Sequence, residues 1–283
     1  HLGRMQRDLE LGEQANTLLL GGGASALDTS IAVARIEAAL RAHTQLEDLG
    51  LRVRRLADSD TLAVESVAGL LDDDVVAAAR TAASDAQLAE PAQPILTYLA
   101  NAIRFGDRQT PYSLVTALDL AAVIPAGEPA TTTAEVDDIR AGPPPIVLND
   151  WTAEDLEAGL GDIVTVEYYL WEEAGALLTE AAQFRVAAIV PIEGLAADRD
   201  FAPDYPGITE ATDVSDWDPP FPIDLDLVRA KDEDYWDEHR TVAKGFVSLA
   251  RGQELWGSRW GQVTSLRLSS ATSLSEQNAD TYR

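Results

Sequence analysis

Apolar and polar side chains alternate along two long runs in the second half of the chain, and no other stretch restricts the fold as tightly. Ile163 to Trp171 alternates after a Gly161-Asp162 turn, and a second run leads back from Ala176 to Pro191. A period of two residues is typical of a strand with one buried face. We therefore expect these strands to pair antiparallel. Val164, Val166 and Tyr168 would lie on one face of the first strand, and Thr165, Glu167 and Tyr169 on the other.

Other segments alternate between strand and helix patterns, which predicts an α+β fold with mixed small sheets, flanking helices and a β-rich lobe. Asp72-Asp73-Asp74 would begin a helix running to Ala86, because acidic residues stabilise the positive end of a helix dipole. Gly106-Asp107 would form the turn of a β-hairpin. The remaining expected elements are strands at 51–56, 61–64, 95–105, 110–118 and 146–148, and a helix at 151–158 capped by Asn149 or Asp150.

A weak internal repeat links the two ends of the chain. Gln14 to Leu20 and Gln262 to Leu268 both have strand character, and each is followed by small polar residues and a capping sequence, at 25–28 and at 272–275. Ser25 or Asp28 would cap a helix, and Ser273 or Ser275 a second one. The first helix would have the apolar positions Ile31, Val33, Ile36 and Leu40. We expect both copies to lie in one subdomain, with residues 10 and 275 on the same face.

The charge of the chain excludes one class of partner. Its 283 residues include 48 Asp and Glu against 21 Lys and Arg, a formal net charge of −27. Such a surface repels phosphate backbones and anionic membrane leaflets, so we expect no nucleic-acid partner. The simpler interpretation of the charge is a soluble or salt-adapted surface. The absence of cysteine excludes disulfides, thiolate catalysis and cysteine-ligated zinc.

Motifs for catalysis are absent from the sequence. None of the three histidines, His1, His43 and His239, lies in a metal-binding pattern, and no G-x-S-x-G is present. Gly21-Gly22-Gly23 lacks the Gly-Lys-Ser/Thr of a phosphate loop. We therefore expect no catalytic, cofactor-binding or metal-binding residue and no cofactor. The alternative for the acidic residues is a Ca²⁺ site, although no EF-hand spacing is present. Its ligands would come from Asp198, Asp200, Asp204, Asp216 and Asp218.

Residues 193–240 form a long acidic excursion that is rich in proline and aromatic residues. A loop of this length is either functional or disordered, and its aromatic content indicates that it packs against something. We expect an ordered segment that packs across a subdomain boundary. Four aromatic residues are candidates for a patch that binds a partner or an apolar substrate, or else they fix the segment to the core. These are Trp217, Phe221, Tyr235 and Trp236.

Several motifs, in this order and spacing, resemble one family of membrane proteins. Leu148 to Leu156 followed by Gly161 to Val166, then Phe184 to Val190, resembles the periplasmic core domain of MacB-like proteins. Lys244 to Trp256 and the strand that ends at Leu268 resemble its closing segment. A subgroup of FtsX-like ABC-transporter permeases has segments similar to three more in this chain: 110–118, 197–207 and 217–236.

The resemblance implies a two-subdomain extracytoplasmic domain of an inner-membrane permease. Residues 1–140 and 241–283 would form a porter-like, membrane-proximal part, residues 141–192 a β-rich lobe, and residues 193–240 the excursion. The Pro/Gly-rich stretch 125–145 would be a hinge. The domain would transmit motion from a separate cytoplasmic ATPase and bind an extracytoplasmic substrate or protein partner, without catalysis.

No run approaches the roughly 18 apolar residues of a membrane span, and the chain begins without Met or a signal peptide. We therefore expect a piece of a longer protein. The alternatives are a stand-alone soluble extracytoplasmic binding protein of the same fold and, third, a hydrolase.

Overall fold

The structure, a computed structural model, describes residues 4, 7, 26–56, 61–85, 89–125, 142–172 and 175–269, with the backbone alone for 26–30 and 89–91. The chain divides into two compact units, residues 1–49 and residues 50–283. Helices and strands are mixed along the second unit, so the protein is α+β, as the sequence predicts.

The first unit contains the helix α2, Ala26–His43, and a short 3₁₀ helix, Glu47–Leu49. The helix predicted around Ile31 and Leu40 is confirmed, but Asp28 lies inside it and therefore does not cap it. Ser25, the other candidate cap, lies outside the described residues. None of the described helices combines the length and the apolar character that crossing a bilayer requires.

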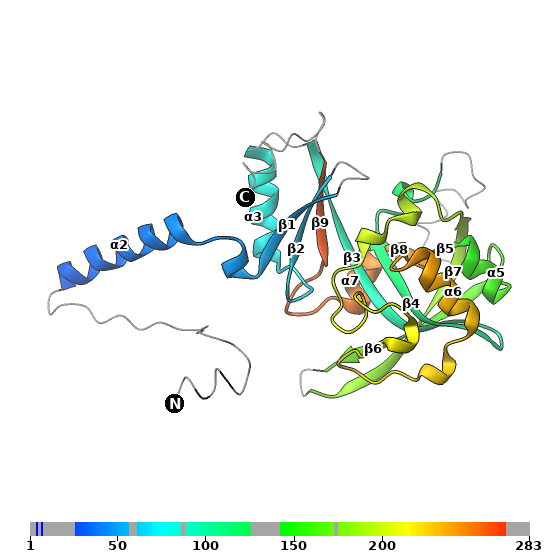
Figure 1. Ribbon diagram of the computed structural model, residues 1–283. Coiled ribbons are helices and arrows are strands. Elements are labelled where there is room, and N and C mark those ends of the chain that lie inside the picture. Colours follow the sequence, from blue (N-terminus) through cyan, green and yellow to red (C-terminus); the bar gives the residue numbers. More distant parts are fainter. Residues whose placement is uncertain are drawn as a thin grey trace. The chain divides into compact units, whose positions relative to one another are not determined.

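The second unit begins with an antiparallel sheet in the order β1-β2-β9-β3. Its strands are β1 (Leu51–Leu56), β2 (Thr61–Ser66), β9 (Ser265–Ser269) and the first part of β3 (Ala89–Phe105). The helix α3, Asp73–Asp85, packs on this sheet (Figure 1), and Asp72 Oδ1 caps it by accepting from Val75 N at 2.8 Å. The acidic start predicted for this helix is therefore confirmed. The core between helix and sheet contains Leu62, Val64, Leu71, Ala83, Val263, Leu266 and Leu268.

A second group of strands closes into a six-stranded barrel in the order β3-β4-β8-β5-β7-β6, because β6 pairs back onto β3. The new strands are β4 (Arg108–Leu118), β8 (Gly245–Ser248), β5 (Pro145–Asn149), β7 (Leu177–Val190) and β6 (Ile163–Trp171). The pairs β4–β8 and β5–β7 are parallel, and the others are antiparallel. With its 17 residues, β3 belongs to both the sheet and the barrel (Figure 1).

Apolar side chains cover both faces of the barrel strands. A first buried cluster contains Ile146 and Leu148 of β5 and Val247 of β8. A second cluster, on the other face, contains Val147 of β5 and Phe246 of β8. Two short helices complete the first cluster, namely α5 (Asp150–Leu156) and α7 (Leu249–Trp256). Asn149 is the N-cap of α5, which confirms one of the two predicted caps: its side chain accepts from Thr152 N.

The β6–β7 hairpin confirms the alternation read from the sequence. The strands pair antiparallel from Ile163↔Arg185 to Trp171↔Leu177. Val164, Val166 and Tyr168 are buried, whereas Thr165, Glu167 and Tyr169, which the sequence predicts for the other face, are only partly buried.

The expectation of a separate β-rich lobe at 141–192 needs correction, because these strands form no sheet of their own. The strand β5 pairs with β8, and β6 pairs with β3, so the hairpin forms part of a barrel with residues from both sides of it in the sequence. Each of these strands has two hydrogen-bonding edges, and local alternation does not specify the partner at the second edge.

The excursion 193–240 is ordered throughout, as predicted. It contains four 3₁₀ helices, Gly194–Ala197, Arg199–Phe201, Val214–Asp216 and Leu225–Leu227, and the helix α6, Ala230–His239.

Several other predictions fall outside the described residues. They are the first repeat copy at 14–20, the caps at 272–275, the relation of residues 10 and 275, and most of the hinge, 126–141.

Candidate functional site

An aromatic cluster anchors the excursion to the barrel. Trp217 and Trp236 meet edge to face with their ring centroids 5.0 Å apart, and Tyr112 of β4 lies 6.2 Å from Trp217. The Tyr112 hydroxyl also contacts the backbone of Asp224, donating to its carbonyl oxygen at 3.2 Å. Because Trp217 is 6% exposed and Trp236 4%, both act as core residues of the excursion rather than as an exposed patch.

Ion pairs and hydrogen bonds hold the start of the excursion on the sheet. Arg54 of β1 bridges Glu65 and Asp200, with nitrogen–oxygen distances of 2.9 and 3.0 Å, and these two carboxylates raise its pKa. Arg52 pairs with Asp204 at 2.6 Å. At the junction with the barrel, the Thr97 hydroxyl donates to the Phe201 carbonyl at 2.8 Å. The excursion therefore packs against both the sheet and the barrel, which lie in one compact unit, residues 50–283. Packing across a subdomain boundary stays a prediction.

A buried carboxylate links α5 to the end of the excursion. The side chain of Asp155 is 2% exposed, and its Oδ2 accepts from Thr110 Oγ1 at 2.6 Å and from Arg229 Nη2 at 2.7 Å. Lys231 contacts the other carboxylate oxygen of Asp155, and Arg229 also binds Asp232. The paired cations satisfy a carboxylate that would otherwise be costly to bury.

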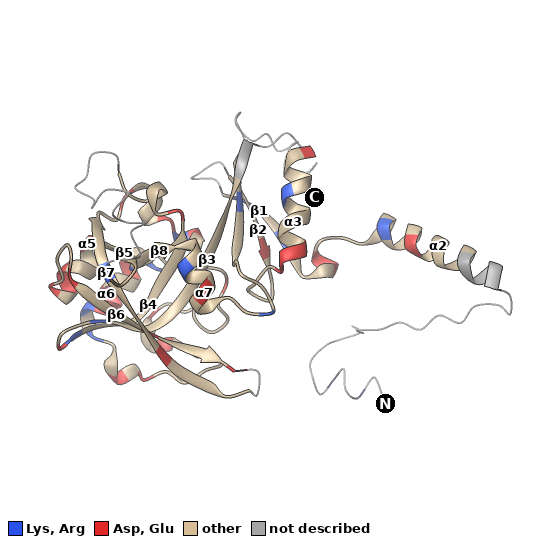
Figure 2. Cartoon of the chain, turned by 180° about the vertical axis from the view of Figure 1, so that it is seen from behind, with Lys and Arg blue, Asp and Glu red and all other residues tan. Residues whose placement is uncertain are grey.

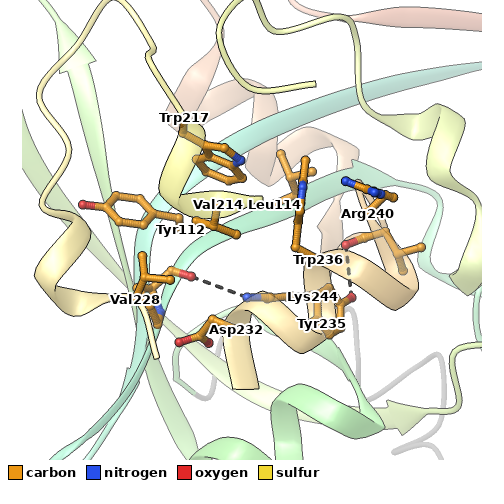
Figure 3. Close-up of a pocket in the computed structure, with 12 residues that line it drawn as sticks. Tyr112, Leu114, Val214, Trp217, Val228, Asp232, Tyr235, Trp236, Arg240 and Lys244 are labelled. Atoms are coloured by element: carbon orange, nitrogen blue, oxygen red, sulfur yellow. Dashed lines mark hydrogen bonds between the residues drawn. The ribbon is translucent and has the colours of Figure 1, made fainter. Parts of the chain in front are cut away.

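Lys244, immediately before β8, is buried beside this network (Figure 3). Its Nζ lies 5.0 Å from the centroid of the Trp151 ring and 4.8 Å from that of Tyr235, and it donates to the Pro111 carbonyl at 3.5 Å. Tyr235 is itself held by Asn149, whose Nδ2 donates to its hydroxyl at 2.9 Å. Burial lowers the pKa of Lys244 to about 8, and the charge of Asp232 offsets part of that effect.

A lysine with a lowered pKa is a candidate nucleophile, but the space around Lys244 argues for a structural role. The adjoining cavity, lined by Tyr112, Trp217 and Trp236 among others, has a volume of about 20 Å³. That volume holds about one water molecule. A substrate would have to displace the aromatic cluster to reach Nζ.

A much larger opening lies at the junction of the sheet, the barrel and the excursion, and we call it the aromatic groove. Its volume is about 470 Å³. Its walls come from the turn after β2, the strands β3, β6 and β7, the excursion, the end of α7, and Thr264 just before β9. Its aromatic lining consists of Tyr98, Tyr169, Trp171, Tyr205, Phe221 and Trp256.

The walls of the aromatic groove are largely fixed. Tyr98 stacks on Trp256 with ring centroids 5.2 Å apart and planes 8° apart, and its hydroxyl donates to the Tyr169 carbonyl at 2.6 Å. The Tyr205 hydroxyl donates to the Thr97 carbonyl at 2.8 Å. Burial raises the pKa of Tyr98 to about 12 and also raises that of Tyr205, so both phenols stay uncharged at neutral pH.

The four aromatic residues predicted as a patch do not lie together on the surface. Trp217, Tyr235 and Trp236 are buried, and Phe221 alone lines the aromatic groove, where its ring meets that of Tyr169 at 6.3 Å. Trp171, which is 61% exposed, did not enter the prediction because it ends an ordinary alternating strand. Lys244 also lacks any local sequence signal.

The acidic residues considered for Ca²⁺ are spread out or paired with arginine. Asp200 and Asp204 bind Arg54 and Arg52, and Asp198 lies 4.0 Å from Arg267. Within the described ranges, no three His, Asp or Glu side chains gather in a way that would hold a metal ion. Figure 2 shows acidic residues on both the sheet and the barrel rather than in a single patch.

No family model and no curated protein matches the sequence. Among solved structures, the chain is similar to the periplasmic region of MacB from Actinobacillus actinomycetemcomitans, at 10% identity and a TM-score of 0.38. The match covers 72% of this chain and 68% of that one.

Proposed function

We propose that the chain is the extracytoplasmic domain of an FtsX-like ABC-transporter permease of an inner membrane, and that it binds a substrate or partner without catalysing a reaction. The aromatic groove supports this proposal most directly. A volume of about 470 Å³ with mainly apolar walls and few polar groups is typical of a small-molecule site. The motifs at 148–166, 184–190 and 244–268 support the family assignment through their resemblance to MacB-like domains.

The same site gives little support to an enzymatic function. Among the described residues that line the aromatic groove, Asp204 is the one carboxylate, and none is histidine, lysine or arginine. General acid–base catalysis needs a titratable group within reach of the substrate. Asp204 is already paired with Arg52, and its side chain is 71% exposed, so it lies at the rim and not inside.

The continuity of β3 supports a mechanical role. A strand of 17 residues spans roughly 50 Å at 3.3 Å per residue, and here it pairs with β9 at one end and with β4 and β6 at the other. Displacement of the sheet would therefore move the barrel and the aromatic groove with it. In a permease, motion driven by a cytoplasmic ATPase would enter the domain through the membrane helices.

The coding sequence on either side of this chain tests the proposal. We expect apolar runs of about 20 residues before His1 and after Arg283. We also expect the protein extracted from membranes to co-purify with an ATPase subunit. A signal peptide directly before His1 together with a stop codon after Arg283 would refute the permease and favour a stand-alone binding protein.

A further inference from the structure

The aromatic groove carries more information about its ligand than its size alone, because its lining is chemically biased. Of the described residues that line it, Asp204 is the single acidic or basic one, and it pairs with Arg52, which does not itself line the aromatic groove. An anionic ligand would find no unpaired cation among the described residues of this lining. It would also approach against the field of a chain with a formal net charge of −27.

The ring systems favour a cation instead. Electron-rich ring faces attract ammonium groups within about 6 Å, and the effect is larger where water is excluded. Two of the phenols that line the aromatic groove, those of Tyr98 and Tyr205, donate to backbone carbonyls, so their hydroxyls are fixed and their rings are held in place. Lys244 shows the same chemistry elsewhere in this protein, with an ammonium group 4.8 and 5.0 Å from two ring centroids.

The polarity of the aromatic groove also has a direction. The deep wall contains Leu96 and Trp256, which are 0% and 2% exposed, whereas Asp204 and Trp171 lie at the exposed rim. Pro203, Pro206 and Pro220 add further apolar surface on the side of the excursion. A ligand that matches this arrangement has an apolar body for the interior and a positive group for the rim.

We infer that the aromatic groove binds a cationic amphiphile, with its apolar body against the stacked rings of Tyr98 and Trp256 and against Phe221, and its ammonium group at the rim near Trp171 and Asp204. This inference rests on the proposed binding function and specifies the substrate class for that same site.

The test compares three probes with the same twelve-carbon chain, all below their critical micelle concentrations. They are dodecyltrimethylammonium, the neutral dodecyl maltoside and the anionic dodecanoate. Binding is followed by calorimetry and by tryptophan fluorescence at about 0.15 M salt, where the long-range attraction of the acidic surface is screened beyond about 8 Å. We expect one saturable site, with dodecyltrimethylammonium binding about tenfold more tightly than the maltoside and dodecanoate binding most weakly.

Variants locate the site. Trp171→Ala and Phe221→Ala should each weaken binding of the ammonium probe by about fivefold or more, since each removes an aromatic wall. Asp204→Asn should weaken the ammonium probe about threefold and leave the maltoside unchanged. Trp260→Ala is the matched control, because Trp260 is 68% exposed but does not line the aromatic groove. Circular dichroism and melting curves confirm that each variant is folded.

Four outcomes separate the inference from the proposed function. The inference is supported if dodecyltrimethylammonium binds more tightly than the other two probes and if the Trp171 and Phe221 variants lose this preference. Ammonium binding that these variants leave unchanged indicates adsorption on the acidic surface and overturns it. Equal or tighter binding of the maltoside or dodecanoate at the same site overturns the cationic ligand but leaves a binding domain. If no probe binds, the inference fails, whereas the permease assignment stands or falls with the flanking sequence.

Discussion

Replacing Lys244 with methionine should stabilise the protein at neutral pH, although it removes a side chain with several partners. The ammonium group is buried, and its pKa is lowered to about 8 from the ordinary lysine value near 10.4. The folded state therefore binds fewer protons than the unfolded state between these two values. Below pH 8 both states are protonated, and the folded state bears the whole cost of the buried charge. As the pH rises from 8 towards 10.4, stability increases.

The magnitude follows from the two pKa values. At 1.36 kcal/mol per pH unit, a pKa of about 8 against 10.4 corresponds to about 3 kcal/mol at pH 7. Methionine removes this cost, but it also loses the attraction to the Trp151 and Tyr235 rings, which is about 0.5–2 kcal/mol per ring. A thioether against the same rings recovers part of that loss. We expect Lys244→Met to raise the free energy of unfolding by about 1–2 kcal/mol at pH 7.

The assay is urea unfolding of the natural protein and the variant at pH 7.0 and pH 9.5. The advantage of the variant should shrink by about 2 kcal/mol between the two pH values, because the lysine cost falls while methionine does not titrate. Burial raises the pKa values of Tyr98 and Tyr235, so these tyrosines lower the stability of the folded protein only at higher pH. They do so in the natural protein and in the variant alike. Lys231→Met is the control, since it removes an ammonium group that is 47% exposed and paired with Asp155.

Two results would contradict the reasoning about Lys244. A variant that is less stable than the natural protein by more than about 1 kcal/mol at pH 7 would mean that Asp232 and the rings compensate the buried charge fully. A stability difference that stays constant from pH 7.0 to 9.5 would mean that the pKa of Lys244 is not lowered. The first result would make Lys244 a stabilising anchor.

Two further substitutions test how the excursion is held. Trp217→Ala should cost about 3–5 kcal/mol, because the side chain is buried against Trp236 and Tyr112, and should lower Tm by about 6–15 °C, whereas Trp260→Ala should change Tm by less than about 2 °C. Unchanged melting and unchanged protease sensitivity of 193–240 would show that Trp217 does not anchor the excursion. Asp155→Ala should cost about 3 kcal/mol in urea unfolding, because it leaves Arg229 and Lys231 without their carboxylate, and Asp155→Asn should cost less. Equal stability of Asp155→Ala and the natural protein would refute the structural role of this network.

Elements set by local pattern could be predicted from the sequence. The β6–β7 hairpin follows from period-two alternation on both sides of a turn, and Asn149 caps α5 because a short side-chain oxygen reaches the amide three residues ahead. The hairpin of β3 and β4 follows from Gly106, whose φ of 57° suits the turn between the two strands. Each of these elements depends on residues within about twenty positions of one another.

The barrel and the aromatic groove depend on distant pairings that local pattern does not encode. The strand β4 pairs with β8 more than one hundred residues later, and both faces of β5 are buried, so alternation gives no orientation there. Composition likewise cannot separate a buried aromatic such as Trp236 from an exposed one such as Trp171. The aromatic groove combines side chains from several segments that are distant in the sequence, and none of these segments has a distinctive motif by itself.

The excursion is held by two kinds of contact that respond differently to solution conditions, and this affects the aromatic groove. Its first part contacts the sheet through ion pairs, such as Arg52 with Asp204, in which the charged groups are partly exposed and therefore screened by salt. Its later part is held by Trp217 and Trp236, whose burial salt does not weaken. The Pro203–Pro206 wall of the aromatic groove lies in the first part, whereas Phe221 follows the buried Trp217 by four residues. One wall is thus held mainly by electrostatic contacts and the other by apolar burial, so a cation that binds near Asp204 would compete with Arg52 for the contact that positions the first wall.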